Sequence, residues 1–207
     1  TGHSFHTMRW DYAYTGGTPE GNLAGLADKR VGLIGTGCTA IQAVGPLGAS
    51  ARELYVFQRT PSAVNARDNR PTDTDWFKDL APGWQMARME NFLNIVNGTP
   101  QDVNLVGDGW TWNFDNLKRL AQADTQGLSP EDFLERADFA HMEKLRARIE
   151  ATVTDREAAE GLKAWYGAAC KRPTFHDDYL DTFNRPNVHL VDTEGRGVER
   201  ITERGAI

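Results

Sequence analysis

A glycine-containing turn after an apolar run could bind the pyrophosphate of a dinucleotide. Six residues with the spacing G-x-G-x-x-A follow a predicted strand at 31–34. The first glycine permits a tight turn, the second lets the backbone approach a phosphate, and the alanine lets the next helix pack closely against the sheet. The free N–H groups at the start of that helix would bind the phosphate oxygens. The residues of this motif are Gly35, Thr36, Gly37, Cys38, Thr39 and Ala40.

The end of the second predicted strand, 54–60, indicates which dinucleotide is bound. An NAD site usually places an Asp or Glu about 20 residues beyond the glycines, to accept hydrogen bonds from the ribose. This chain has Gln58, Arg59 and Thr60 there, without a carboxylate. A guanidinium pairs with a phosphate through two hydrogen bonds, and a neighbouring hydroxyl adds a donor. We therefore expect NADP(H) rather than NAD(H); the alternative is a solvent-exposed arginine at a strand end.

The elements that would position these residues indicate an α/β chain. Beyond the two strands and the helical run that begins near Ala40, strand patterns return at 187–192 and 197–202. Between them lies a long segment without strand-like alternation. It contains a helix start at Ser129 and Pro130 and helical patterns at 139–153 and 157–166.

This pattern predicts a Rossmann-like NADP-binding domain with an inserted helical subdomain. Residues 1–30 would be an interdomain linker, and residues 72–166 the helical insertion. The NADP-binding domain would consist of two segments, 31–71 and 167–207. Trp110 and Trp112 would pack in the core of the insertion or line a substrate tunnel.

Composition limits the classes of function. The formal charge of −6 over 207 residues argues against a general nucleic-acid partner. No apolar run reaches about 18 residues, so no membrane-spanning helix is expected. The two cysteines, Cys38 and Cys170, form no disulfide framework, which is typical of the reducing cytoplasm. The histidines lack metal-ligand spacing, and we expect no metal site.

The first residues resemble the fingerprint of a known enzyme family. Gly2, His6, Trp10 and Asp11 follow the pattern G-x-x-x-H-x-x-x-W-D, which resembles that of the flavin-containing (type I) Baeyer–Villiger monooxygenases. Further segments similar to that family follow in the same order along nearly the whole chain. They lie at residues 35–40, 56–61, 67–71, 170–173 and 179–188.

The resemblance implies a fold, cofactors and site residues. The family binds NADPH and FAD in separate domains and uses O2 to convert a ketone into an ester or lactone. By this resemblance, residues 35–40 hold the pyrophosphate, and Arg59, Thr60 and Lys171 surround the 2′-phosphate. Arg172 matches the catalytic arginine, which holds the negatively charged oxygenated flavin beside the nicotinamide. An exposed basic pair after a helix is the alternative for Lys171 and Arg172.

The resemblance also implies that this chain is a piece of a longer polypeptide. The partner would be the FAD domain of the same polypeptide, so that the fragment would be inactive alone. We expect His6 and Trp10 to order the linker, with coupling of domain motions as the functional variant.

Two rival functions remain open. One is a domain of an N- or S-oxygenating flavin monooxygenase, against which Trp10–Asp11 and Arg172 argue. The other is a non-catalytic NADPH-binding module, which the absence of a flavin motif in this sequence keeps open.

Overall fold

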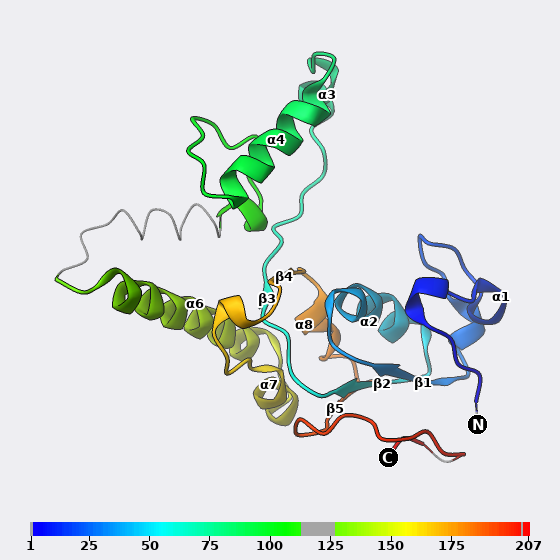
Figure 1. Cartoon of the computed structure of the whole chain (residues 1–207). Coiled ribbons are helices and arrows are strands. Elements are labelled where there is room, and N and C mark those ends of the chain that lie inside the picture. The colour runs from blue at the N-terminus through cyan, green and yellow to red at the C-terminus, as the bar shows by residue number, and fades with distance from the viewer. Residues whose placement is uncertain (1, 113–126, 204) are drawn as a thin grey trace. The chain divides into compact units, whose positions relative to one another are not determined.

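The computed structural model describes residues 2–112, 127–203 and 205–207, and it divides into two compact units (Figure 1). The sheet unit contains Thr1–Val64 and Met142–Ile207, and the helical unit contains Asn65–His141. The sheet unit is therefore discontinuous in sequence. The helical unit ends at His141, whereas we expected the insertion to extend to residue 166.

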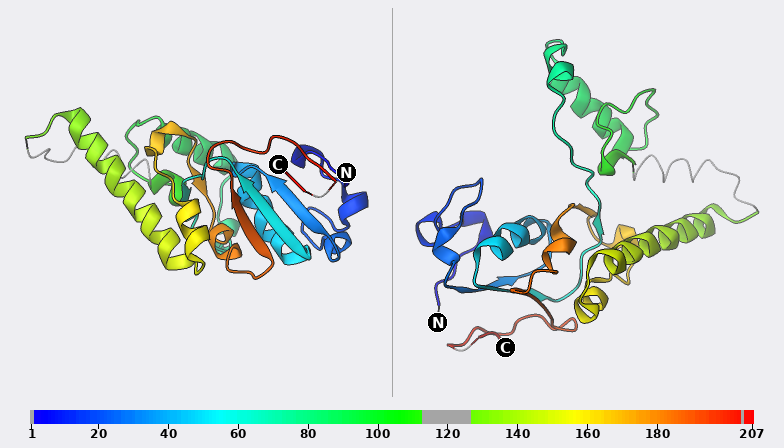
Figure 2. Two further views of the ribbon diagram at one scale, coloured as in Figure 1. Left: turned by 90° about the horizontal axis from the view of Figure 1, so that it is seen from below. Right: turned by 180° about the vertical axis from the view of Figure 1, so that it is seen from behind.

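The sheet unit has a three-stranded parallel sheet with strand order β1-β2-β5 (Figure 2). Its strands are β1 (Arg30–Ile34), β2 (Glu53–Gln58) and β5 (Val188–Asp192). In the register of the sheet, Val56 of β2 lies between Leu33 and Leu190. This parallel arrangement confirms the Rossmann-like α/β fold.

Helix α2 (Cys38–Ser50) connects β1 to β2 and covers one face of the sheet (Figure 1). Its buried residues include Ala40, Ile41, Val44 and Leu47, which lie on one side at helical spacing. They share a core with Leu54 and Val56 of β2, both 0% exposed. The short helix α8 (Tyr179–Thr182) packs against α2.

The segment at 2–29, where we expected a linker, belongs to this unit and contributes two residues to its core. They form η1 (Thr7–Arg9), α1 (Tyr12–Thr15) and η2 (Ala24–Leu26). Leu23 and Leu26 are each 3% exposed and belong to the main hydrophobic core.

The helical segment after residue 129 is interrupted where we expected it to continue. Helix α6 (Pro130–Thr152) ends before Asp155, whose carboxylate accepts a hydrogen bond from the Ala158 N–H at 2.8 Å and begins α7 (Arg156–Leu162). The predicted helix at 157–166 was too long, because α7 ends at Leu162. Met142, Leu145 and Ile149 of α6 are buried within the sheet unit.

The strand expected at 197–202 is wrong. Instead, an isolated antiparallel bridge pairs Ile201 with Ala206, and Arg200 and Ile207 exchange two backbone hydrogen bonds beside it. Gly197 has a φ of +80°, which turns the backbone out of the extended conformation where the strand would begin. Between α7 and β5 the chain forms η3 (Ala168–Cys170) and β4 (Thr174–Phe175), which pairs with β3 (Val64–Asn65).

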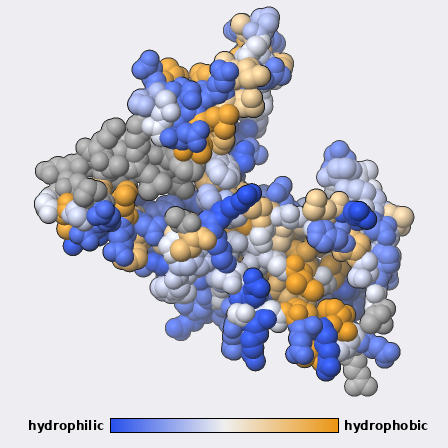
Figure 3. All heavy atoms as spheres, in the orientation of Figure 1, coloured by the Kyte–Doolittle hydropathy of each residue, from blue (hydrophilic) through white to orange (hydrophobic). Residues whose placement is uncertain are grey.

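The helical unit contains α3 (Thr74–Lys78) and α4 (Trp84–Val96). The buried Asn91 side chain donates to the Val103 carbonyl at 2.7 Å and accepts from the Leu105 N–H at 2.9 Å, which holds the following loop. Three hydrophobic residues on α4 lie at the surface of this helix, where Figure 3 shows hydrophobic side chains. They are Met86, Met89 and Leu93.

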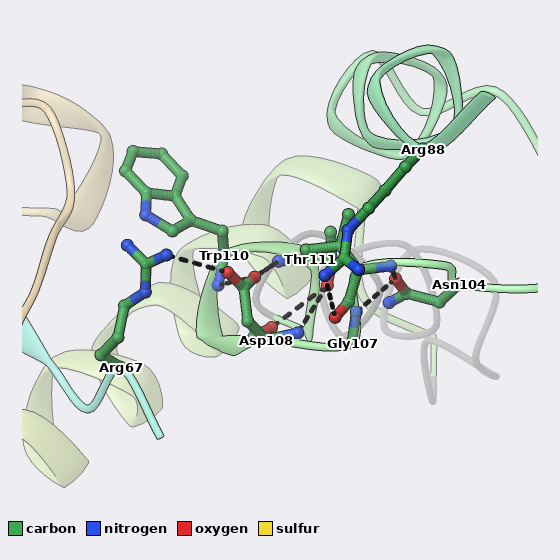
Figure 4. Close-up of polar contacts among 8 residues, drawn as sticks. Arg67, Arg88, Asn104, Gly107, Asp108, Trp110 and Thr111 are labelled. Atoms are coloured by element: carbon green, nitrogen blue, oxygen red, sulfur yellow. Dashed lines mark hydrogen bonds and ion pairs between the residues drawn. The ribbon is translucent and has the colours of Figure 1, made fainter. Parts of the chain in front are cut away.

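A second polar cluster of this unit surrounds Asp108 (Figure 4). The Asp108 carboxylate accepts from the N–H groups of Trp110 and Thr111 at 3.1 and 3.3 Å, and it lies 3.6 Å from Arg67. Trp112 is 49% exposed, so its expected place in a core is wrong.

Candidate functional site

The backbone conformation at the first position of the turn requires a glycine. Gly35 follows β1 directly, and its N–H donates to the carbonyl of Phe57 at 2.9 Å. Its φ is +107°, a conformation that residues with a side chain rarely adopt. Gly35 therefore turns the chain sharply at the carboxyl end of the sheet, where α/β folds place their ligands.

The second glycine has no such need. Gly37 has a φ of −76° and is the N-cap of α2, and no side chain caps this helix. A Cβ on Gly37 would meet no atom within 4 Å. Cys38 and Thr39, the next residues, are exposed. The first N–H groups of α2 therefore face open space beside a residue without a side chain, which fits a bound pyrophosphate.

Hydrogen bonds tie the turn to the segment that follows β2. The buried Thr36 hydroxyl donates to the Thr60 carbonyl at 2.8 Å. The Ser62 hydroxyl donates to the Thr36 carbonyl at 2.5 Å. These two bonds hold the expected pyrophosphate and 2′-phosphate regions together. Ala40 is 7% exposed and packs in the core beneath the turn.

The residues at the end of β2 point in different directions. Gln58 is 0% exposed, and its amide nitrogen donates to the Gly161 carbonyl at 2.7 Å and to Asp192 at 3.2 Å. Gln58 therefore connects β2 to α7 and β5. Arg59, the next residue, is exposed, and its Cδ lies 3.6 Å from the Cβ position of Gly197.

Lys171 and Arg59 carry like charges that affect each other. The pKa of Lys171 lies below its usual 10.5, first because of partial burial and second because of the Arg59 charge. The Lys171 ammonium lies 4.7 Å from the ring centroid of Tyr166. Within the described part of the chain, neither cation has a carboxylate partner. A bound anion would relieve this repulsion.

Arg172 follows Lys171 and is exposed. Its side chain makes no hydrogen bond or ion pair with the residues that the structure describes. Its assignment as the catalytic arginine remains a prediction, as do the roles of the other site residues.

The fingerprint residues near the N-terminus bond locally. His6 Nδ1 accepts from the Met8 N–H at 3.2 Å, and Trp10 Nε1 donates to the Thr15 hydroxyl at 3.0 Å. Asp11 accepts from the Tyr14 N–H at 3.0 Å and caps α1. These contacts order residues 6–15, and Gly2 is exposed before them.

The pKa of Asp11 lies below its usual value. The main cause is the hydrogen bond from the Tyr14 N–H, and the bond with His3, at 2.9 Å, is the second.

Other classes of site have no support in the described residues. Among residues 2–112, 127–203 and 205–207, no three His, Cys, Asp or Glu side chains are placed to hold a metal ion. In the same ranges, no helix is both long enough and apolar enough to cross a membrane. Both cysteines are free thiols at the surface.

Three polar side chains that hold the segments around the site together could not be predicted from the sequence. Ser62, Tyr166 and Arg148 connect segments far apart in sequence; the Arg148 guanidinium donates to the carbonyls of Val64 and His176 at 3.0 and 3.1 Å. Single polar residues at such positions carry no spacing signal. Only the three-dimensional contacts reveal them.

The whole length of this chain matches known proteins. No family model matches the chain. The chain is 54% identical over 209 residues to neopentalenolactone D synthase of Streptomyces avermitilis, a match that covers 100% of this chain and 35% of that protein. It is 53% identical over 211 residues to Baeyer-Villiger monooxygenase ATR8 of Stachybotrys chlorohalonatus, covering 100% of this chain and 34% of that protein. The chain thus spans about a third of the length of these curated relatives.

Solved structures also match nearly the whole chain. The polycyclic ketone monooxygenase of the thermophilic fungus Thermothelomyces thermophila matches with a TM-score of 0.81 and 44% identity, over 98% of this chain and 34% of that chain. A crystal structure of OTEMO in complex with FAD and NADP matches with a TM-score of 0.67 and 25% identity, over 99% of this chain and 40% of that chain.

Proposed function

We propose that this chain forms the NADP(H)-binding part of a Baeyer–Villiger monooxygenase, since its whole length matches about a third of the length of relatives with that name. The full enzyme would bind FAD as well, and it would use O2 to convert a ketone into an ester or lactone. Proteins with this similarity include one solved with both FAD and NADP, which supports both cofactors.

One observation carries the proposal: Arg59 and Lys171, two cations without a carboxylate partner among the described residues, accompany a glycine turn that leaves helix N–H groups free. Partial burial and, second, the Arg59 charge lower the pKa of Lys171. Neither side chain forms an ion pair with a described residue. A 2′-phosphate carries close to two negative charges and would pair with both cations. The open space at Gly37 would accept the pyrophosphate of the same ligand.

Each residue of the site has a separate task in this proposal. When bound, NADPH would supply the hydride that reduces the flavin. Arg59, Lys171 and the N–H groups at the start of α2 bind the dinucleotide, and the bond from Thr36 to Thr60 holds their segments in place. Arg172 adds a guanidinium charge, suited to an anion that develops during oxygen transfer.

We further propose that the enzyme acts in the cytoplasm. Cys38 and Cys170 are both exposed free thiols, which suits a reducing compartment.

Calorimetric titration with NADPH and NADH tests the proposed cofactor. The Arg59→Ala variant removes a charged donor from the 2′-phosphate, so NADPH affinity should fall roughly 10- to 100-fold while NADH affinity stays nearly unchanged. Arg52→Ala is the matched control, because Arg52 is an exposed arginine just before the opposite end of β2. Equal affinity of the wild-type chain for both dinucleotides would contradict the assignment.

A further inference from the structure

Tyr166 connects the two segments that carry the cations of the proposed site. Its hydroxyl donates to the Pro61 carbonyl at 2.8 Å and accepts from the Ala63 N–H at 3.1 Å. Its ring lies beneath the Lys171 ammonium, 4.7 Å from the nitrogen. One side chain therefore contacts both the segment after Arg59 and the lysine opposite it.

The protonation state of Tyr166 suits this double contact. Burial is the main cause that raises the pKa of its phenol above the usual 10.0. The hydroxyl therefore remains protonated at neutral pH and continues to donate to the Pro61 carbonyl.

A further bond fixes the same segment. The Thr174 hydroxyl donates to the Ala63 carbonyl at 2.7 Å, so the backbone after Pro61 is held from two sides.

The ring compensates for an unfavourable arrangement of charge. Arg59 repels the Lys171 ammonium, and that repulsion alone would move the flexible lysine side chain away from the arginine. An ammonium above an aromatic face is attracted by the negative face of the ring. The Tyr166 ring thus holds Lys171 near Arg59 before any phosphate arrives, which lowers the cost of ordering the lysine upon binding.

We propose that Tyr166 is a positioning residue that strengthens the preference of this site for NADPH over NADH. The proposal rests on the NADP(H) function proposed above. The ring positions Lys171 against the 2′-phosphate, and the hydroxyl fixes the backbone directly after Arg59 and Thr60.

Two variants separate the ring from the hydroxyl. Tyr166→Phe retains the aromatic face and loses both hydrogen bonds, whereas Tyr166→Leu loses both functions. The ratio of NADH to NADPH dissociation constants should fall about two- to fivefold in Tyr166→Leu, the range expected for one exposed cation–π contact. Tyr166→Phe should retain most of the preference and unfold at a lower temperature, because it leaves the Pro61 carbonyl and Ala63 N–H unpaired.

A double-mutant cycle tests whether Tyr166 acts through Lys171. Lys171→Met removes the charge that the ring positions. If the ring acts on that charge, adding Tyr166→Leu to Lys171→Met should change the dinucleotide ratio no further. Trp165→Leu is the matched control, because the adjacent Trp165 ring lies 4.5 Å from a different cation, Arg146. This control should leave the ratio unchanged.

The outcomes of these titrations are distinguishable. A wild-type chain that binds neither dinucleotide overturns the proposed function and the inference with it. A wild-type chain that prefers NADPH, with an unchanged preference in Tyr166→Leu, overturns the inference alone. Equal loss of preference in Tyr166→Phe and Tyr166→Leu also overturns it, because the ring would then not be the positioning element.

Discussion

The two glycines of the turn should respond in opposite ways to the same substitution. Gly35 needs its residue type for the backbone, since its φ is +107°. Gly37 has an ordinary φ of −76° and open space around its Cβ position. We therefore expect Gly35→Ala to reduce stability, and Gly37→Ala to reduce dinucleotide binding while the fold is retained.

The magnitudes follow from these geometries. An alanine held at a positive φ costs about 1 to 3 kcal/mol, partly offset by the smaller entropy of the unfolded chain, which leaves about 1 to 2 kcal/mol. For Gly35→Ala this lowers the melting temperature by about 2 to 8 °C. For Gly37→Ala, the poorer N-cap costs about 0.5 to 1 kcal/mol and the entropy gain returns about as much, so the melting temperature changes by less than about 2 °C.

The binding assay uses both dinucleotides, because both contain the pyrophosphate. A methyl group on Gly37 would occupy the space that the pyrophosphate needs, and overpacking of this kind lowers affinity roughly 5- to 150-fold. NADPH and NADH should be affected equally, in contrast to Arg59→Ala, which should affect NADPH alone. Unchanged binding by Gly37→Ala, or a stability loss equal to that of Gly35→Ala, would refute the assignment of the turn.

Three other predictions concern stability and protonation. Gly48→Ala should destabilise the sheet unit by about 1 to 3 kcal/mol in urea denaturation, because its methyl would lie 2.9 Å from Val188 Cγ2; an unchanged midpoint would contradict this packing. Asn91→Leu should cost about 1 to 3 kcal/mol, since it removes two hydrogen bonds to the backbone of the 103–105 loop, and hydrogen exchange in that loop should accelerate; wild-type protection there would argue against the contact. The Asp11 carboxyl should titrate below 3.8 in carbon-13 NMR, with the Tyr14 N–H as the main cause. Because this folded-state pKa lies below the unfolded one, the stabilisation is present above about pH 4 and is lost as pH falls through the folded value; a midpoint above 3.8 would refute it.

The local elements of the nucleotide fold could be predicted from the sequence. The apolar run before Gly35 is β1, the helix that contains Ala40 is α2, and the run at 187–192 is β5. Each of these segments has a clear hydrophobic pattern or lies next to a glycine motif that is typical of this fold. The resemblance to Baeyer–Villiger monooxygenases, carried by short motifs in a fixed order, is confirmed by the comparisons.

The errors occurred where a pattern was extended beyond the residues that form the element, or where a function depends on long-range contacts. The helical pattern at 157–166 was too long, because the Asp155 cap starts a separate helix and the chain turns after Leu162. The alternation at 197–202 indicated a strand of the sheet, yet Gly197 has a positive φ, and the residues after it pair with 205–207 through a single bridge instead of joining β5. The role of Tyr166 rests on contacts across more than 100 positions of sequence, which no local pattern contains.

The position of β5 in the sheet affects how the chain folds while it is being synthesised. Gln58 at the end of β2 bonds to Asp192 at the end of β5, and these residues are 134 positions apart. At a translation rate of about 5 to 20 residues per second, roughly 7 to 27 s pass between the emergence of the two strands from the ribosome. During this interval one edge of β2 has no strand to pair with, although β1 and α2 have already been made. The nascent chain therefore exposes a hydrophobic strand edge while the whole helical unit is translated, and this is the stage at which chaperone binding would matter most.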